Sequence, residues 1–278
     1  MKTYDCPPTL TDTQVLEVCK QGYLILEGVV PEEINQRTLA FVEANPSGEP
    51  TEILDEDWFV EQVICQPEAA GAVRSLLGRN FVLPILVSNH RTEMPAEAQR
   101  WHRDGGSQYG PAQHYLQVFY YPETCTREMG PTELLPGSHH LFSQSRRMAH
   151  YGKIKMSVYA AVPAGSIIIT VYSIWHRRSA STETGIRNML KYNYWRTVHP
   201  ERDWIIEPDF DVATADYEFD GLHVGEQFRD CYDAAEMYFW LSGKSSEFQL
   251  MGGQGWPVPG KRSTKPLGFP GQLTGRRY

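Results

Sequence analysis

A short segment near the middle of the chain combines residue types that bind metal ions. It runs Trp101, His102, Arg103, Asp104. In an extended backbone successive side chains point to opposite faces, so His102 and Asp104 lie on one side and Trp101 and Arg103 on the other. With a further histidine, for which His176 is the candidate, they would form the two-histidine, one-carboxylate set that holds non-haem Fe(II). A His-x-Asp triple also arises by chance, and a surface turn is the alternative reading.

An arginine downstream adds a candidate anion site to this metal set. His176 follows the most β-prone stretch of the chain, Ser166–Tyr172, and Arg187 comes eleven positions later, at the start of the next predicted strand. An arginine there could reach into the fold and bind a carboxylate through two parallel hydrogen bonds. A metal set beside a buried anion clamp is a more specific combination than either feature alone.

Composition and charge indicate a protein that acts on small molecules. The chain has 278 residues and a formal net charge of −8, which argues against nonspecific nucleic-acid binding because that requires a strongly basic surface. Its five cysteines are scattered, as expected of free thiols in a reducing compartment. The N-terminal residues lack the apolar core of a signal peptide, and no apolar run is long enough to span a membrane. We therefore expect a cytoplasmic protein with no nucleic-acid or membrane partner; its oligomeric state is not predicted.

Helix signals dominate the first part of the chain. Thr11 and Gln14 have the spacing of a capping box. Gly22 interrupts that helix before a strand over 23–26, and Pro31 opens a second helix that runs toward Asn45. A third helical stretch is expected over 59–78. These helices should wrap around the remainder of the fold.

Strand signals begin at Phe81. Segments rich in Val, Ile, Tyr and Thr predict strands over 81–89, 115–121, 131–135, 156–162, 166–172 and 187–196. Strands in this number and at this spacing indicate a sandwich or barrel. We expect a single domain over residues 1–278, with helices over 11–78, a barrel core over about 81–197 and a C-terminal part over 198–278.

The strand predicted over 187–196 has an unusual distribution of side chains. Its odd positions are mostly polar, as in Arg187, Lys191 and Asn193, whereas its even positions include Leu190 and Tyr192. A polar inner face with an apolar outer face suits a barrel that holds a polar ligand and is covered outside by helices.

The C-terminal part reads as a loop, a helix and a tail. Seven acids and no Lys or Arg occur between Asp203 and Asp220, a pattern typical of a solvated loop. Helical spacing follows over 223–242. Beyond Glu247 the sequence is basic and rich in Gly and Pro, which favours disorder, with a lid over an anionic ligand as the alternative.

The order of these motifs resembles the phytanoyl-CoA dioxygenase family, of which ectoine hydroxylase is a relative. The resemblance covers about residues 11–197 and rests on Trp101, His102, Asp104, Gly130-Pro131, Pro136-Gly137-Ser138-His139, Pro163-Ala164-Gly165-Ser166, His176 and Arg187. It implies a mainly β fold with flanking helices, the double-stranded β-helix, which is a jelly-roll or cupin-like barrel. It also implies an enzyme that uses Fe(II), 2-oxoglutarate and dioxygen.

The resemblance assigns roles to individual residues. His102, Asp104 and His176 are similar to the family's iron ligands and catalytic centre, and Arg187 to the partner of the distal carboxylate of 2-oxoglutarate. Gln117 stands where the family places a polar contact to this co-substrate, although a solvent-facing strand glutamine is equally compatible with the pattern. His139 is expected in a structural turn, not at a metal.

The implied reaction is that of a dioxygenase that hydroxylates or otherwise oxidises a C–H bond of a small molecule, with release of succinate and CO2. The basic tail and Arg103, Arg177 and Arg178 favour an anionic or polar substrate. The retained Asp104 favours hydroxylation over halogenation, since halogenating enzymes of this type carry Gly or Ala there. One residue departs from the family: Arg178 replaces a small hydroxyl residue two positions after the distal histidine, and a plain surface arginine is the favoured reading. A barrel that binds ligand or metal without turnover and a zinc hydrolase remain as alternatives.

Overall fold

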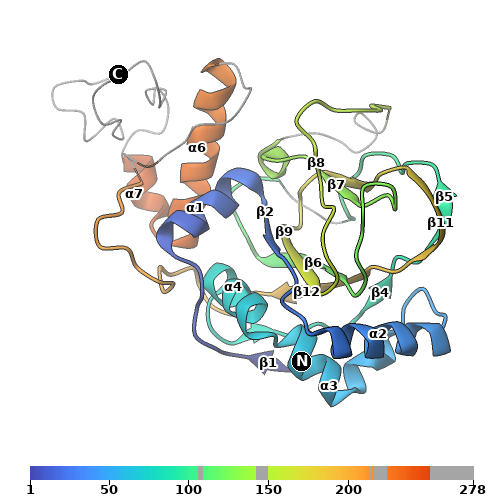
Figure 1. Cartoon of the computed structure of the whole chain (residues 1–278). Helices are drawn as coiled ribbons and strands as arrows, with labels where there is room; N and C mark the ends of the chain where they lie inside the picture. Colours follow the sequence, from blue (N-terminus) through green and yellow to red (C-terminus); the bar gives the residue numbers. More distant parts are fainter. Residues whose placement is uncertain (106–108, 142–149, 213–214, 216–223, 251–278) are drawn as a thin grey trace.

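The computed structural model describes residues 1–105, 109–141, 150–212, 215 and 224–250 (Figure 1). Its α-helices are α1 (Asp12–Gln21), α2 (Glu32–Ala44), α3 (Asp57–Phe59), α4 (Pro67–Leu77), α6 (Val224–Leu241) and α7 (Ser245–Leu250). Its strands are β1 (Thr3–Tyr4), β2 (Tyr23–Leu26), β3 (Phe81–Val82), β4 (Ser88–Asn89), β5 (Thr92–Ala96), β6 (Tyr115–Tyr121), β7 (Thr132–Leu134), β8 (Val158–Tyr159), β9 (Ser166–Val171), β10 (His176–Arg178), β11 (Ser181–Arg187) and β12 (Leu190–Trp195). The predicted basic tail from 251 onward lies outside the described residues. None of the described helices is long and apolar enough to cross a membrane.

The main sheet contains seven antiparallel strands in the order β1-β3-β12-β6-β9-β2, with β4 also beside β12. Its register aligns Gln117 of the central β6 with Asn193 of β12 on one side and Thr170 of β9 on the other. Because side chains alternate across a sheet, these three residues share one face. That face is the inner one. It carries the polar residues at the odd positions of the segment 187–196, as predicted.

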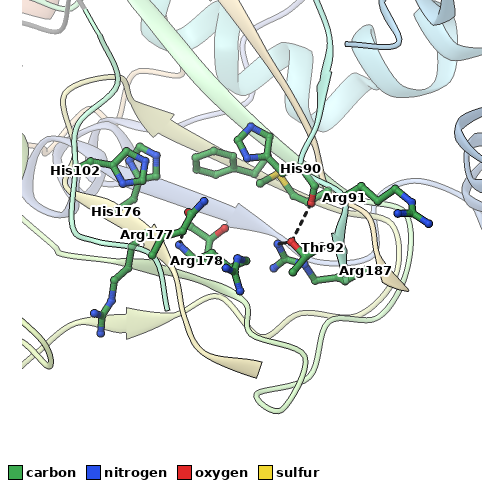
Figure 2. A pocket seen from close by; sticks show the side chains of 12 residues that line it. His90, Arg91, Thr92, His102, His176, Arg177, Arg178 and Arg187 are labelled. Atoms are coloured by element: carbon green, nitrogen blue, oxygen red, sulfur yellow. Dashed lines mark hydrogen bonds between the residues drawn. The ribbon is translucent and has the colours of Figure 1, made fainter. Parts of the chain in front are cut away.

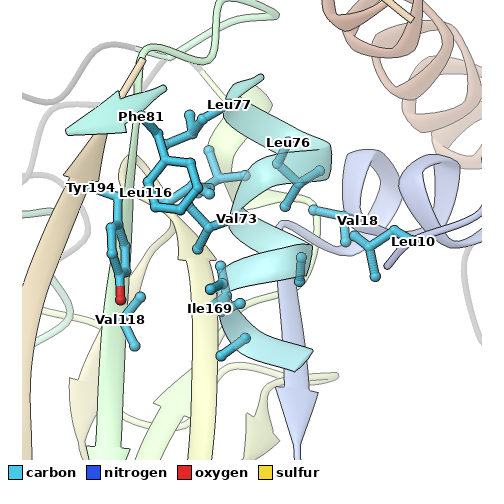
Figure 3. Close-up of a cluster of buried hydrophobic side chains, with 14 of the residues drawn as sticks. Leu10, Val18, Val73, Leu76, Leu77, Phe81, Leu116, Val118, Ile169 and Tyr194 are labelled. Atoms are coloured by element: carbon cyan, nitrogen blue, oxygen red, sulfur yellow. The ribbon is translucent and has the colours of Figure 1, made fainter. Parts of the chain in front are cut away.

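The outer face of the main sheet is apolar and is covered by helices (Figure 3). Val73 and Leu76 of α4 belong to the same buried cluster as Leu116, Ile169 and the other outward residues of β6 and β9. Burial of apolar surface stabilises such a layer by roughly 25 cal/mol per Å² removed from water. This packing holds the sheet rigid and leaves its other face to the site.

Helix α1 and the turn after it confirm the local predictions. Thr11 Oγ1 accepts from the Gln14 N–H, and the Gln14 side chain accepts from the Thr11 N–H, which is the predicted capping box. Gly22 ends the helix in the left-handed conformation at φ 82°, where a residue without Cβ avoids a steric penalty. The chain can therefore turn at once into β2, at the edge of the main sheet.

Two smaller antiparallel sheets face the inner side of the main sheet. One has the order β10-β7-β8 and the other pairs β11 with β5. A second apolar cluster, including Phe119 of β6, Ile168 of β9 and Leu134 of β7, fills the space between the layers. The predicted mainly β fold with flanking helices is confirmed. The strands of the described residues form three sheets and do not close into one barrel.

Several predicted strand boundaries are wrong for local reasons. The segment 81–89 divides into β3 and β4 around Pro84, which has no N–H to donate to a ladder. The segment 187–196 is interrupted because the Asn188 N–H donates to Glu123 Oε1 at 2.7 Å instead of to a strand. Arg187 thus lies at the end of β11, not at the start of a strand.

The structure also corrects one predicted helix and one predicted strand, and it contains strands that were not predicted. The helix predicted over 59–78 is broken before Pro67, where the Gln66 side chain caps α4 by accepting from the Ala69 N–H at 2.8 Å. Of 156–162 only Val158 and Tyr159 are in a strand. Strands β5, β10 and β11 were not predicted, because their short polar sequences lack an alternating apolar pattern.

The C-terminal helix α6 confirms the prediction over 223–242 and packs against α1. The junction centres on Asp12, which is fully buried and accepts hydrogen bonds from Arg202 at 2.6 and 2.8 Å, Trp204 at 2.6 Å, Tyr238 at 2.6 Å and the Glu207 N–H at 2.7 Å. The described part of the acidic segment, 203–212, is a loop as predicted. It is anchored through this carboxylate to the first turn of α1.

Candidate active site

The three residues predicted to bind a metal, His102, Asp104 and His176, lie close together on the inner side of the main sheet. The backbones of His102 and His176 pair directly, with hydrogen bonds of 3.1 and 3.0 Å in both directions. His102 Nε2 lies 4.0 Å from Asp104 Oδ1, and His176 Nε2 lies 3.9 Å from Asp104 Oδ2. One ligand atom from each residue falls within 4.8 Å of the others. Two imidazoles and a carboxylate in this arrangement suit Fe(II) and leave open positions for other ligands.

Backbone carbonyls orient both imidazoles. His102 Nδ1 lies 2.8 Å from the Arg100 carbonyl oxygen, and His176 Nδ1 lies 3.1 Å from the Ile174 carbonyl oxygen. A carbonyl only accepts, so each Nδ1 carries the proton and each Nε2 keeps its lone pair. This second hydrogen bond is the usual device for fixing the tautomer of a metal-binding histidine.

The electrostatics favour the protonation states that a metal requires. Burial would raise the pKa of Asp104, but His176, Lys191 and Gln117 outweigh it and lower that pKa to about 2. Burial lowers the pKa of His176 to about 4, against the opposing effect of Asp104. At neutral pH the site therefore offers an ionised carboxylate and a neutral imidazole.

Two side chains from the inner face of the main sheet hold the Asp104 carboxylate. Lys191 Nζ donates to Asp104 Oδ2 at 3.0 Å, and Gln117 Nε2 donates to the same oxygen. Gln117 is fully buried, so the solvent-facing alternative is wrong. Lys191 was not predicted as a site residue. Its odd position in the segment 187–196 places it on the inward face of the strand, and this was the signal that could have identified it.

A buried frame supports the segment that carries the ligands. Trp101, on the face opposite His102, is fully buried and donates to the Gly152 carbonyl oxygen at 2.9 Å. The Arg177 guanidinium lies 4.7 Å from the centre of the Trp101 ring, and its Nε pairs with the buried Glu133 at 2.6 Å. These contacts tie the His-x-Asp segment, β10 and β7 into one unit.

A pocket of about 100 Å³ opens beside two of the ligands (Figure 2). It is lined by His90, Arg91, Thr92, Gln99, His102, Phe119, Thr132, His176, Arg177, Arg178, Arg187 and Met189. None of these twelve residues is an acid. The pocket therefore presents an excess of positive charge and suits an anionic ligand next to the metal set.

Arg187 is one of the residues that line this pocket. It is 1 % exposed, and its Nη1 donates to the Gly130 carbonyl oxygen at 2.6 Å. Its Nη2 lies 3.5 Å from Thr92 Oγ1, while its buried Nε has no hydrogen-bond partner in the described part of the chain. The guanidinium is thus held in place by neutral groups and keeps its charge for a ligand.

Arg178 and His90 also line the pocket. The surface reading of Arg178 is wrong, and burial followed by the charge of Arg187 lowers its pKa. His90 was not singled out from the sequence, since no spacing links it to other ligands. Burial and the charge of Lys191 lower the pKa of His90 to about 4. His139 lies in a 3-10 turn against the Cys19 carbonyl oxygen, as predicted for a structural histidine.

Several solved structures have the same fold. HygX from Streptomyces hygroscopicus, with nickel and 2-oxoglutarate bound, aligns with a TM-score of 0.57 and 14% identity over 70% of this chain and 90% of its own. SnoN, a non-heme alpha ketoglutarate dependent epimerase from nogalamycin biosynthesis, aligns with a TM-score of 0.53 and 15% identity over 66% and 79%. AviO1 from Streptomyces viridochromogenes Tue57 gives 0.51 and 15% over 67% and 95%. At such identities the likeness shows the jelly-roll fold.

The sequence itself carries a family signature. A comparison with curated protein sequences finds no match. The phytanoyl-CoA dioxygenase (PhyH) family, in contrast, matches over residues 18–189. This range is more than half of the chain and includes all five predicted site residues. The chain belongs to the phytanoyl-CoA dioxygenase family, whose enzymes use Fe(II), 2-oxoglutarate and dioxygen.

Proposed function

We propose that this protein is a 2-oxoglutarate-dependent non-haem iron dioxygenase that hydroxylates, or otherwise oxidises, a C–H bond of a small molecule. In this proposal His102, Asp104 and His176 hold the iron. Arg187 would bind the distal carboxylate of 2-oxoglutarate, and Gln117 positions Asp104 and would make a polar contact to this co-substrate. Residues 1–278 act as one domain, in the cytoplasm.

The observation that carries the proposal is the position of Arg187 relative to the metal set. One ligand atom from each of His102, Asp104 and His176 lies within 4.8 Å of the others. The adjoining pocket contains a buried guanidinium, and no acid is among its described lining residues. A 2-oxo dicarboxylate joins these two features, because its oxo acid end chelates a metal while its far carboxylate pairs with an arginine.

The chain's own residues supply binding and orientation. Iron with 2-oxoglutarate and dioxygen would supply the oxidising power for the C–H bond, with succinate and CO2 as co-products. Lys191 and Gln117 hold Asp104 in one orientation through its Oδ2. Phe119 and Met189 give the pocket apolar walls that limit water near the reacting atoms. The retained Asp104 supports oxidation over halogenation.

A binding and turnover assay tests the proposal. Purified protein with Fe(II), ascorbate and 2-oxoglutarate should bind the co-substrate and form succinate when a substrate is supplied. We expect His102→Ala to abolish succinate formation, because one of three metal ligands is lost. His199→Ala, which changes an exposed histidine outside the metal set, is the matched control and should retain full activity. Iron-dependent turnover by His102→Ala at the unaltered rate would refute the assignment.

The substrate is proposed to be an anionic or polar small molecule, bound apart from the arginine-lined pocket that is assigned to 2-oxoglutarate. A structural neighbour described as an epimerase makes stereochemical inversion a second candidate outcome. Products formed under ¹⁸O-labelled dioxygen separate the two, because hydroxylation places the label in the product and inversion does not. Binding of 2-oxoglutarate without any decarboxylation across a broad substrate panel would instead favour a non-catalytic binding protein.

A further inference from the structure

Besides Arg187, the pocket beside the metal set contains Arg178, which pairs with no carboxylate of the described residues. Arg178 stands two residues after His176 on β10, and its Nη2 donates to the Glu97 carbonyl oxygen at 2.8 Å. Its Nη1 is buried and has no hydrogen-bond partner among the residues that the structure describes. A buried guanidinium nitrogen left unpaired is costly, so a ligand atom is expected to complete it.

Arg178 and Arg187 approach the same part of the pocket from two different strands (Figure 2). Arg187 has an unpartnered buried Nε, and Arg178 has an unpartnered buried Nη1. Arg177, their neighbour in the pocket lining, is neutralised by Glu133. Two guanidinium groups that repel each other in a pocket whose described lining contains no acid favour the binding of an anion between them.

Hydrogen bonds to the segment 97–99 fix the position of the Arg178 side chain. Its N–H donates to the Gln99 side-chain oxygen at 3.1 Å, and its carbonyl oxygen accepts from the Gln99 N–H at 2.9 Å. Together with the Glu97 contact, these bonds hold both the main chain and the guanidinium of Arg178 against the 97–99 segment. The arginine is therefore preorganised and loses little side-chain entropy when a ligand binds.

We infer that Arg178 is a second anchor for the distal carboxylate of 2-oxoglutarate, which this enzyme holds between the guanidinium groups of Arg178 and Arg187. The inference rests on the proposed function, since it assumes that 2-oxoglutarate fills this pocket. It makes Arg178 a determinant of specificity for dicarboxylic over monocarboxylic 2-oxo acids. A ligand with the same chain length but no distal carboxylate gains nothing from either arginine.

Titration of the Mn(II)-loaded protein with two ligands tests this pairing. Isothermal titration calorimetry without dioxygen compares 2-oxoglutarate with 2-oxopentanoate, which lacks only the distal carboxylate. Arg178→Met should raise the Kd for 2-oxoglutarate by about 10- to 100-fold, the equivalent of a lost charge-assisted hydrogen bond. The Kd for 2-oxopentanoate should change by less than about threefold. Arg187→Met should show the same selective loss.

Two further variants complete the experiment. Arg178→Lys keeps the charge but not the planar fork, and should give an intermediate loss for 2-oxoglutarate. Arg127→Met removes an exposed arginine outside the pocket lining and should leave both ligands unaffected. Binding of 2-oxopentanoate by each variant also reports that the site is folded.

The outcomes separate this inference from the proposed function. An unchanged Kd for 2-oxoglutarate in Arg178→Met, or an equal loss for both ligands, would overturn the role of Arg178 while leaving the enzyme assignment intact. Failure of the wild-type protein to bind 2-oxoglutarate with Mn(II) would overturn the proposed function itself.

Discussion

The buried ion pair between Arg177 and Glu133 should make a large contribution to the stability of the strands that carry the site. We expect Glu133→Gln to lower the free energy of unfolding by about 3 kcal/mol. Glu133 is fully buried and Arg177 is 8 % exposed, with Nε and Oε2 2.6 Å apart. Loss of one member of a buried pair costs about 3–5 kcal/mol, because the remaining charge is uncompensated. The Arg177 contact with the Trp101 ring persists and offsets about 1 kcal/mol, which gives the lower end of that range.

Urea denaturation followed by far-UV circular dichroism at neutral pH measures this effect. The wild type, Glu133→Gln, Arg177→Met and the double variant form a double-mutant cycle. The double variant carries neither charge, so its loss of stability should be smaller than the sum of the two single losses by about 2 kcal/mol. Glu183→Gln, which alters an exposed acid on β11, is the matched control and should stay within about 0.5 kcal/mol of wild type.

Two results would contradict this account of the ion pair. One is a loss below about 1 kcal/mol for Glu133→Gln, the magnitude of a surface ion pair. The other is strict additivity in the cycle, which would mean that the two side chains stabilise the fold through separate contacts.

Three further predictions concern the metal set, the turn after α1 and the Asp12 junction. Saturating Mn(II) should raise the melting temperature by about 5 °C in wild type and not in His176→Ala, as measured by differential scanning fluorimetry. Gly22→Ala should cost about 2 kcal/mol in urea unfolding, because a Cβ at φ 82° would also clash with His139; a neutral result would refute this. Burial opposes ionisation of Asp12, but its hydrogen bonds, led by Arg202, lower its pKa. The stability that Asp12 contributes should therefore be complete above its unfolded pKa of about 3.9 and be lost as the pH falls through the lower folded value. In Asp12→Asn this acid-dependent component should disappear from urea unfolding measured across pH.

Local signals in the sequence were sufficient where neighbouring residues decide the structure. The capping box of Thr11 and Gln14 and the left-handed turn at Gly22 depend on contacts within a few residues. The alternation of side chains places His102 and Asp104 on one face for the same reason. Strand parity likewise identified the inward face of β12, because a period of two holds for any strand whatever it pairs with.

The tertiary structure alone decided which inward residues meet. Lys191 and Asp104 are 87 positions apart in the chain, yet their side chains are 3.0 Å apart. Their contact depends on the register of β12 and β6 and on the pairing of the 101–104 segment with β10. The segment 97–99 packs against Arg178, but no residue near Arg178 in the sequence indicates this contact. The sequence therefore predicted a surface position for Arg178. Residue types and local periods are encoded along the chain, whereas charges in a shared pocket are brought together by long-range strand pairing, which no local pattern encodes.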